Sequence, residues 1–202
     1  GPLHLPLTLE DVRPPQKHGM DLNRKQFSKT FAGEPLTLEV SRLAEQATAS
    51  VIARYGGTAV LAAVTMSHAD KTVNYFPLVV DYEERFYATG KVIGSRFVRR
   101  EGRPSEEAVL SGRLIDRTLR PLFDHRLRRE VQVVVTILSY DEKYELDCIA
   151  LLAASTALAI SPIPWDGPVA GIQLMQREKG ESAMVNPANT DLAKGFRYSM
   201  FA

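Results

Sequence analysis

The chain has 202 residues, of which 45% are hydrophobic and 24% charged, and its formal net charge is +1. This composition excludes a disordered or fibrous protein, and the length suits one large domain or two small ones. The single cysteine, Cys148, excludes an intrachain disulfide and predicts a buried thiol in a reducing compartment. The longest apolar run, residues 148–160, is too short to cross a bilayer, and no signal-peptide pattern is visible, so we expect no membrane association.

The first 22 residues are expected to form an extension. Four prolines, at positions 2, 6, 14 and 15, prevent a long regular element. The Gly-Pro start matches the remnant that a protease leaves on an expressed protein, and Met20 is a candidate internal start. We therefore divide the chain into an N-terminal extension or expression remnant, 1–22, and one domain, 23–202.

Alternating apolar residues predict two β-hairpins early in this domain. Residues 27–40 predict the first hairpin, with Gly33-Glu34-Pro35 as its turn. Residues 44–64 contain the pair Gly56-Gly57 ahead of a β-branched run, which favours a second hairpin over a helix. A strong strand is expected at residues 76–82.

A glycine-punctuated loop, residues 90–103, is expected to lead directly into a helix. Pro104 fits the first turn of that helix, which runs to about Leu119. Glu106 and Glu107 would place negative charge near the helix N-terminus, where it is favourable.

The later elements complete an α+β pattern. Residues 131–139 are largely β-branched and predict a buried strand. Residues 147–160 are apolar on almost every face and predict a core helix. A short strand is expected at 167–173, then a loop, and the start of a further strand at 196–202. Strand hairpins followed by alternating helices and strands indicate an α+β domain.

Positive charge gathers in one window of the chain. Residues 91–130 contain eleven lysines and arginines but only six acidic residues, although the whole chain is nearly neutral. Such a window on a neutral protein is typical of a localised site for a polyanion.

The loop in this window carries cations on glycine-hinged backbone. Guanidinium groups and free backbone N–H groups in such loops bind phosphates. Phe97 adds an aromatic face on which a base can stack. A solvated surface loop remains the alternative. The candidate binding residues are Phe97, Arg99, Arg100 and Arg103, with Lys91 and Arg96 nearby.

The helix that follows carries Arg113, Arg117 and Arg120 on one stripe, at i, i+4 and i+7. Apolar residues bracket this stripe, namely Val109 on one side and Leu110 and Leu114 on the other. The bracketing predicts partly buried arginines, which need partners. Asp116 is a candidate partner, so the stripe is either an internal salt-bridge network or an anion pocket.

No catalytic constellation stands out. The four histidines lack the spacing of a metal site, and no serine elbow, Walker loop or dinucleotide fingerprint is present. Asp81, Glu83 and Glu84 are better explained as strand-end charges than as metal ligands. Trp165 is expected to pack in a turn.

Taken together, residues 76–123, FPLVVDYEERFYATGKVIGSRFVRREGRPSEEAVLSGRLIDRTLRPLF, closely resemble the first RNase PH-like core of the bacterial polynucleotide phosphorylase family. The likeness continues through EVQVVVTILSYD, the apolar helix and the VNP segment at 185–187. It begins near residue 24 and covers nearly all of the rest. The blocks RREGRPSE and RLIDRTLRPLF are long and specific.

The resemblance implies an RNase PH-like (ribosomal protein S5 domain 2-like) β-α-β-α core, which would be incomplete at the C-terminal end of this chain. Family members are nucleotidyltransferases that degrade mRNA from the 3′ end in the cytoplasm. Inorganic phosphate attacks the terminal linkage and releases nucleoside diphosphates, reversibly. The family also has KH- and OB-type RNA-binding domains and forms homotrimeric rings. Other proteins of RNA degradation are further candidate partners.

The resemblance also assigns roles to residues. Phosphorolysis and Mg²⁺ binding belong mainly to a second core, so no catalytic or metal-binding residue is expected here. Residues matching Phe97, Arg99, Arg100 and Arg103 hold single-stranded RNA in the neck of the ring. Those matching Arg113 and Arg117 form a vestigial anion site. The chain departs from the family where Val98 replaces a second aromatic residue and Arg96 is an extra cation.

Three functions follow as hypotheses. The first is the non-catalytic first core of a phosphorolytic exoribonuclease, which positions RNA and helps to assemble the trimer. The second is an RNA-binding or scaffold module without a role in catalysis. The third is a compact RNase PH-like enzyme that trims tRNA, which the RREGRPSE block disfavours.

Overall fold

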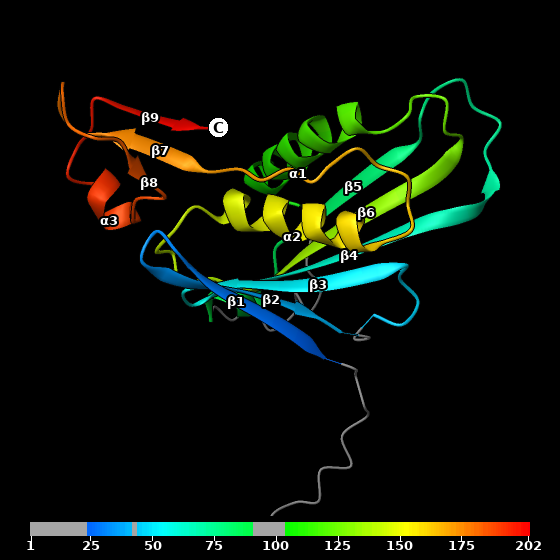
Figure 1. Ribbon diagram of the computed structural model, residues 1–202, viewed down its shortest axis with the longest axis horizontal. Coiled ribbons are helices and arrows are strands. Elements are labelled where there is room, and N and C mark those ends of the chain that lie inside the picture. Colours follow the sequence, from blue (N-terminus) through cyan, green and yellow to red (C-terminus); the bar gives the residue numbers. More distant parts are fainter. Residues whose placement is uncertain (1–23, 42–43, 91–103) are drawn as a thin grey trace, which may run out of the picture.

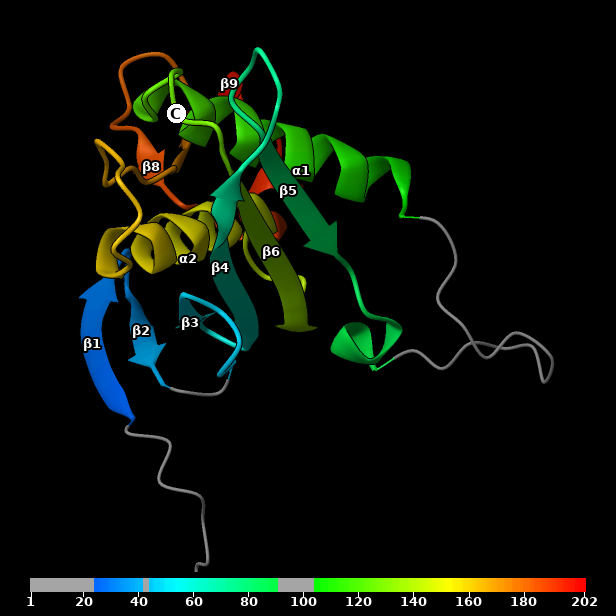
Figure 2. The same ribbon diagram turned by 90° about the vertical axis from the view of Figure 1, so that its right-hand side faces the viewer.

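The protein is built on a six-stranded sheet with the strand order β1-β2-β3-β4-β6-β5. The structure is a computed structural model that describes residues 24–41, 44–90 and 104–202. The strands of this sheet are β1 (Lys25–Phe31), β2 (Glu34–Val40), β3 (Ala49–Tyr55), β4 (Thr58–Asp70), β5 (Leu78–Glu83) and β6 (Arg129–Ser139). Figure 2 shows the sheet running from β1 at one edge to β5 at the other.

The first predicted hairpin is confirmed, but its turn lies one residue earlier than expected. Ala32 and Gly33 form the turn, with φ of 46° and 87°. Positive φ at both central residues suits the twist of a two-residue hairpin, and glycine adopts it without strain. Glu34 and Pro35 therefore belong to β2, and Phe31 pairs with Glu34 across the turn.

The second hairpin turns at Gly56-Gly57, as predicted. The carboxylate of Asp141, which follows β6, accepts hydrogen bonds from the Gly57 N–H at 2.8 Å and the Thr58 hydroxyl at 2.9 Å. A Cβ atom on Gly57 would lie 2.9 Å from Asp141. Glycine is thus required here because a carboxylate approaches the backbone closely.

β5 and β6 are the one parallel pair among the described strands of this sheet, and α1 (Glu106–Leu119) connects them. A parallel pair needs such a crossover connection. η2 (Phe86–Thr89) precedes the connection, and η3 (Arg120–Leu122) continues α1 for one turn. α1 packs against β5, so the predicted arginine helix lies at the β5 edge of the sheet.

The core lies between the sheet and the second long helix, α2 (Leu146–Ile160). α2 packs against β3, β4 and β6, as an apolar helix with small residues can, and Figure 1 shows it beside α1. Cys148 is buried within it, as predicted. Neither of the described long helices has the length and apolar character to span a membrane. Side chains buried to 1% or less include Val51, Val60, Val64, Val131, Val133, Val135, Ala150, Ala153 and Ala154.

The C-terminal part forms a small three-stranded sheet at one end of the molecule, with the order β8-β7-β9 (Figure 1). The short strand predicted at 167–173 was wrong in its bounds, because backbone pairing begins only with the Ile172–Ala202 hydrogen bonds and β7 starts at Gln173. The Val169 N–H instead donates to the Ser155 hydroxyl of α2 at 2.9 Å, and Pro168 has no N–H to donate. The elements are β7 (Gln173–Gln176), β8 (Met184–Val185), α3 (Asn189–Leu192) and β9 (Tyr198–Phe201), the last of which was expected.

Candidate nucleic-acid interface

The glycine-punctuated loop at residues 90–103, here called the arginine-rich loop, connects η2 to α1. Phe97, Arg99, Arg100 and Arg103, the predicted RNA-binding residues, lie outside the described residues. On the upstream side, the Tyr140 N–H donates to the Ala88 carbonyl at 2.9 Å, which ties η2 to the end of β6. The downstream side is the start of α1.

Ser105 fixes the start of α1. Its hydroxyl accepts a hydrogen bond from the Ala108 N–H at 3.0 Å and donates to the Glu84 carboxylate at 2.8 Å. The first contact is an N-cap, and the second ties the cap to the end of β5. Pro104 therefore lies just before the cap, and the prediction that it occupies the first helical turn was wrong by two positions.

Arg120, one of the three arginines on the predicted stripe, is bonded to groups within the fold. Its guanidinium donates to both carboxylate oxygens of Asp116, at 3.1 and 2.6 Å. It also donates to the carbonyl oxygens of Phe76 and Leu78, each at 3.2 Å. Arg120 thus joins α1 to the start of β5 and uses most of its donors, so the internal salt-bridge alternative is correct for this residue.

Arg113 and Arg117 behave differently from Arg120. Both are exposed on α1, one helical turn apart, and neither has a hydrogen bond or ion pair with any other residue that the structure describes. Their donors are free for an anion, because a guanidinium offers five N–H groups in a planar fork. The two arginines thus present an unneutralised pair of cations at the surface.

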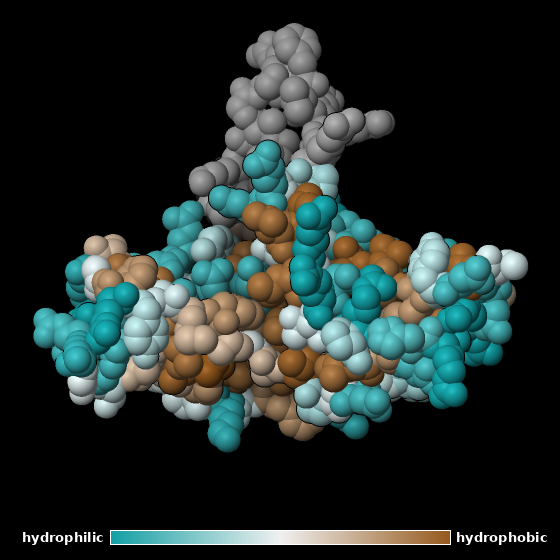
Figure 3. Space-filling view, turned by 90° about the horizontal axis from the view of Figure 1, so that it is seen from above, coloured by the Kyte–Doolittle hydropathy of each residue, from teal (hydrophilic) through white to brown (hydrophobic). Residues whose placement is uncertain are grey.

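The apolar residues beside these arginines are exposed as well. Val109 is 44% exposed and Leu110 64%, and the expected partial burial of the arginines was wrong for Arg113 and Arg117, although it holds for Arg120. The buried face of α1 is formed instead by Ala108, Gly112, Ile115 and Leu119. Figure 3 looks onto the α1 side of the molecule and shows hydrophobic and hydrophilic residues interleaved in the middle of that face. This face combines free cations with accessible apolar surface.

Comparisons with known proteins identify the fold and the family. Residues 33–164 match the 3′ exoribonuclease family, domain 1 (RNase PH). The chain belongs to this family. The matched region thus runs from β2 to α2 and includes the second hairpin, the arginine-rich loop, α1 and β6.

Curated relatives of this RNase PH family member carry the name polyribonucleotide nucleotidyltransferase. The protein of Lysinibacillus sphaericus is 50% identical over 151 residues, which is 75% of this chain and 21% of the relative. The protein of Halalkalibacterium halodurans is 46% identical over 175 residues, 87% of this chain and 24% of the relative. These similarities are consistent with an RNase PH-like core of a protein of this kind. The chain spans about a fifth to a quarter of the length of these relatives.

Solved structures share the RNase PH fold at low sequence identity. Rice (Oryza sativa) Rrp46 superposes with a TM-score of 0.60 and 15% identity, covering 95% of this chain and 84% of that one. A chain of the Archaeoglobus fulgidus exosome with RNA bound to the active site gives 0.55 and 15%, covering 89% and 76%. The predicted RNase PH-like α+β fold is therefore confirmed.

Two half-buried carboxyl groups of this RNase PH core were not singled out as a site from the sequence. Glu145 is the N-cap of α2, and Asp147 lies in its first turn. Burial raises the pKa of both, and the charge of Asp147 raises the pKa of Glu145 further, whereas a hydrogen bond from Ser111 of α1 partly offsets the effect of burial on Asp147. Burial also raises the pKa of the neighbouring Tyr82 phenol. The only feature of the sequence that pointed to these carboxyl groups was Asp147, an acidic residue at the start of an otherwise apolar helix.

The other residues considered as site candidates make contacts within the fold. Asp81 accepts a hydrogen bond from Gln132 at 2.8 Å, and Glu83 pairs with Arg85, which supports the expectation of strand-end charges. Trp165 packs near Phe123, with ring centroids 6.3 Å apart. Within the described ranges no group of three or more histidine, cysteine or acidic side chains is placed to hold a metal ion.

Proposed function

We propose that this chain is the RNA-holding first core of a phosphorolytic 3′-to-5′ exoribonuclease of the polyribonucleotide nucleotidyltransferase type. The observation that carries the proposal is the pair Arg113 and Arg117, exposed and without partners among the described residues, on the helix that the arginine-rich loop enters. Guanidinium forks of this kind bind phosphate groups. In a member of a 3′ exoribonuclease family, RNA is the natural source of those phosphates.

In this proposal the core positions single-stranded RNA and another part of the enzyme breaks it. Phe97, Arg99, Arg100 and Arg103 grip the strand in the neck of a homotrimeric ring, and Arg113 and Arg117 hold a phosphate on α1. Inorganic phosphate and Mg²⁺ act mainly at a second core. The enzyme would act on RNA in the cytoplasm.

A scaffold role is the second candidate, and the exposed apolar residues favour it. Val109 and Leu110 lie on the same helix as the free arginines. Apolar residues next to arginines are typical of surfaces that bind protein. RNA binding and subunit assembly are therefore alternative functions for the same face of α1. Substitution of its arginines distinguishes them.

The RNA-binding test compares two sets of substitutions. Arg113→Gln with Arg117→Gln removes two cations, and Arg197→Gln removes an exposed cation near the small sheet as a matched control. Binding of a labelled oligoribonucleotide is measured over a range of salt concentrations. We expect the double variant to lower the slope of log affinity against log salt by about 1.4, since each phosphate contact to a single strand contributes about 0.7. An unchanged slope would show that neither arginine contacts phosphate and would favour the scaffold role.

A second test addresses catalysis. The 202-residue chain is incubated with a 3′-labelled oligoribonucleotide, phosphate and magnesium, and the released products are analysed. We expect RNA binding without release of nucleoside diphosphate. Release at a rate comparable with that of a complete relative would overturn the assignment of catalysis to another core.

A further inference from the structure

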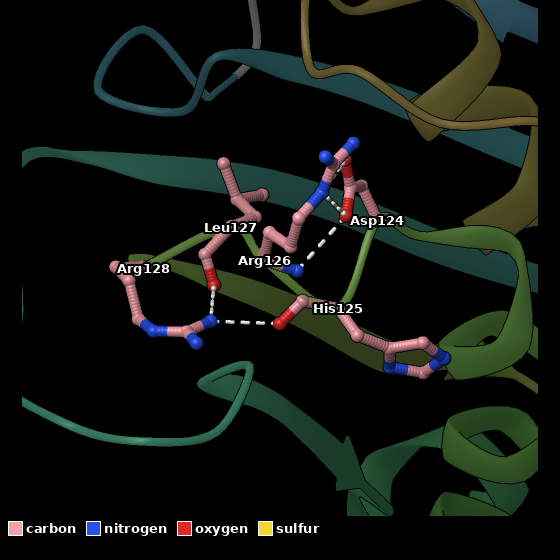
Figure 4. A network of polar contacts seen from close by, with 5 residues as sticks. All are labelled: Asp124, His125, Arg126, Leu127 and Arg128. Carbon is pink, nitrogen blue, oxygen red and sulfur yellow. Dashed lines mark hydrogen bonds and ion pairs between the residues drawn. The ribbon is translucent and has the colours of Figure 1, made fainter.

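The turn between η3 and β6, residues 123–128, and the first residue of β6 together carry three arginines that the proposed RNA site does not use. Arg126 and Arg129 are exposed and Arg128 is half-buried. This turn follows the C-terminal end of α1, whereas the arginine-rich loop enters the helix at its N-terminal end. Figure 4 shows the arginine side chains of residues 126 and 128 pointing in different directions from the turn.

The turn is fixed to the loop between β4 and β5, residues 71–77. The Lys71 N–H donates to the Arg128 carbonyl at 2.9 Å. The rings of Phe76 and Phe123 lie 4.9 Å apart. Tyr75, which directly precedes Phe76, is 66% exposed. The two segments therefore form one supported platform with a phenol ring at its surface.

Most of the cations on this platform have a local carboxylate partner. These pairs lie at the surface, where ion pairs contribute little and are easily exchanged for another anion. Arg126, for example, remains 90% exposed in its pair. The pairs are Arg126 with Asp124 at 2.8 Å, Lys71 with Glu130 at 2.7 Å and Arg129 with Asp70 at 3.5 Å.

Arg128 has no carboxylate partner among the described residues. One nitrogen of its guanidinium, Nη1, donates to the carbonyl oxygens of His125 at 2.7 Å and Leu127 at 3.2 Å (Figure 4). Neutral carbonyls orient the group without cancelling its charge. Nη2 and Nε are left with donors that fit an incoming phosphate.

We propose that Lys71, Tyr75, Arg126, Arg128 and Arg129, the Arg128 patch, form a second contact for single-stranded RNA. Arg128 binds a phosphate, and Tyr75 stacks on a base, as aromatic residues of single-strand binders do. This inference rests on the proposed RNA-binding function and extends the contact beyond Arg117, in the last turn of α1, to the end of the helix opposite the arginine-rich loop. The 14-residue helix is about 21 Å long, so only a strand long enough to follow it reaches both the start of α1, where the arginine-rich loop enters, and the Arg128 patch.

The experiment measures binding of labelled oligoribonucleotides of 6 and 24 nucleotides to the 202-residue chain. For the longer strand, we expect Arg128→Gln to weaken binding about 3- to 10-fold and to lower the salt slope by about 0.7, the value for one phosphate contact. Tyr75→Ala should weaken binding without changing the slope, because stacking releases no counterions. Arg197→Gln is the matched control, and circular dichroism verifies that each variant folds.

The outcomes separate this inference from the proposed function. If Arg113→Gln with Arg117→Gln weakens binding of the 24-mer while Arg128→Gln has no effect, the Arg128 patch is excluded and the proposed function stands. If the wild-type chain binds neither oligonucleotide, both fail. If Arg128→Gln weakens binding of inorganic polyphosphate as strongly, and Tyr75→Ala has no effect on RNA, the patch is a general anion surface and the RNA assignment is wrong.

Discussion

The sequence places Arg113, Arg117 and Arg120 on one helical stripe. In the structure, however, their side chains have two different environments. Arg120 is bonded to Asp116 and to the carbonyls of Phe76 and Leu78, whereas the other two are exposed. A helical wheel gives the direction of each side chain, but it does not show which side chains come within hydrogen-bond distance of the neighbouring sheet. The carbonyl acceptors of Arg120 lie 42 and 44 residues away in the chain, so no local pattern identifies them.

This difference predicts that two similar substitutions change stability by different amounts. Arg120→Ala should lower the free energy of unfolding by about 1 to 2 kcal/mol, because it removes charged hydrogen bonds at a site that is partly exposed. Arg113→Ala is the control on the same helix and should change stability by less than about 0.5 kcal/mol. Chemical denaturation of both variants provides the measurement. Equal losses would mean that Arg113 also has a structural partner.

Asp147 and Glu145 allow a prediction about pH. Because burial raises the pKa of both carboxyls, the folded chain holds their protons more tightly than the unfolded chain. Stability from these groups is therefore present at low pH and is lost as the pH rises above the ordinary carboxyl range.

The variant Asp147→Asn cannot ionise, so it should be more stable than the wild type at pH 7. Its advantage should shrink as the pH falls toward about 4, where the wild-type carboxyl also becomes neutral. Melting temperatures between pH 4 and 8 measure the difference, with Asp166→Asn, an exposed acid, as the control. A difference that does not vary with pH would show that the side-chain amide alters packing rather than charge.

At the scale of the elements, the sequence predicted the type of nearly every long helix and strand but not every boundary. Periodicity identifies hairpins and amphipathic faces, and the positions of α1, α2 and β6 follow from it. Boundaries depend on particular hydrogen bonds instead. The cap at Ser105 excludes Pro104 from α1, and the bond from Val169 to Ser155 directs the Val169 N–H to α2 instead of to a neighbouring strand.

The Ser105 cap supports a prediction about α1. Ser105→Ala removes the acceptor of the Ala108 N–H and the donor to Glu84, and it should cost about 1 kcal/mol of stability. Ser105→Asp is the informative second variant. Aspartate keeps the cap, but it places a second carboxylate beside Glu84.

If the cap to Ala108 dominates, Ser105→Asp should be close to the wild type in denaturant unfolding. If the contact with Glu84 dominates, Ser105→Asp should be less stable than Ser105→Ala, because two carboxylates repel each other. Wild-type stability in both variants would contradict the role of Ser105 in fixing α1.

The whole molecule depends on α2, because this helix contacts three strands of the large sheet and lies beside α1. Its nearly uniform burial is why the sequence could place it in the core without knowing its neighbours. The exposed face of α1 is the opposite case. Its amphipathic pattern is incomplete, and only the structure shows that Val109 and Leu110 are accessible. Prediction from sequence thus succeeded for the largely buried helix α2 and failed for the exposed apolar residues of α1.

Cys148 on α2 reports whether this core opens as a unit. The thiol is 5% exposed, and burial raises its pKa to about 12, so almost no reactive thiolate is present in the folded protein at neutral pH. We expect a thiol reagent to modify Cys148 only through opening of the core, with a rate that rises in denaturant as stability falls. Cys148→Ala combined with Ser182→Cys, an exposed position, supplies the rate of a freely accessible thiol. If Cys148 reacts at a similar rate without denaturant, α2 is not held in the core, and the packing of the helix on β3, β4 and β6 is not stable in solution.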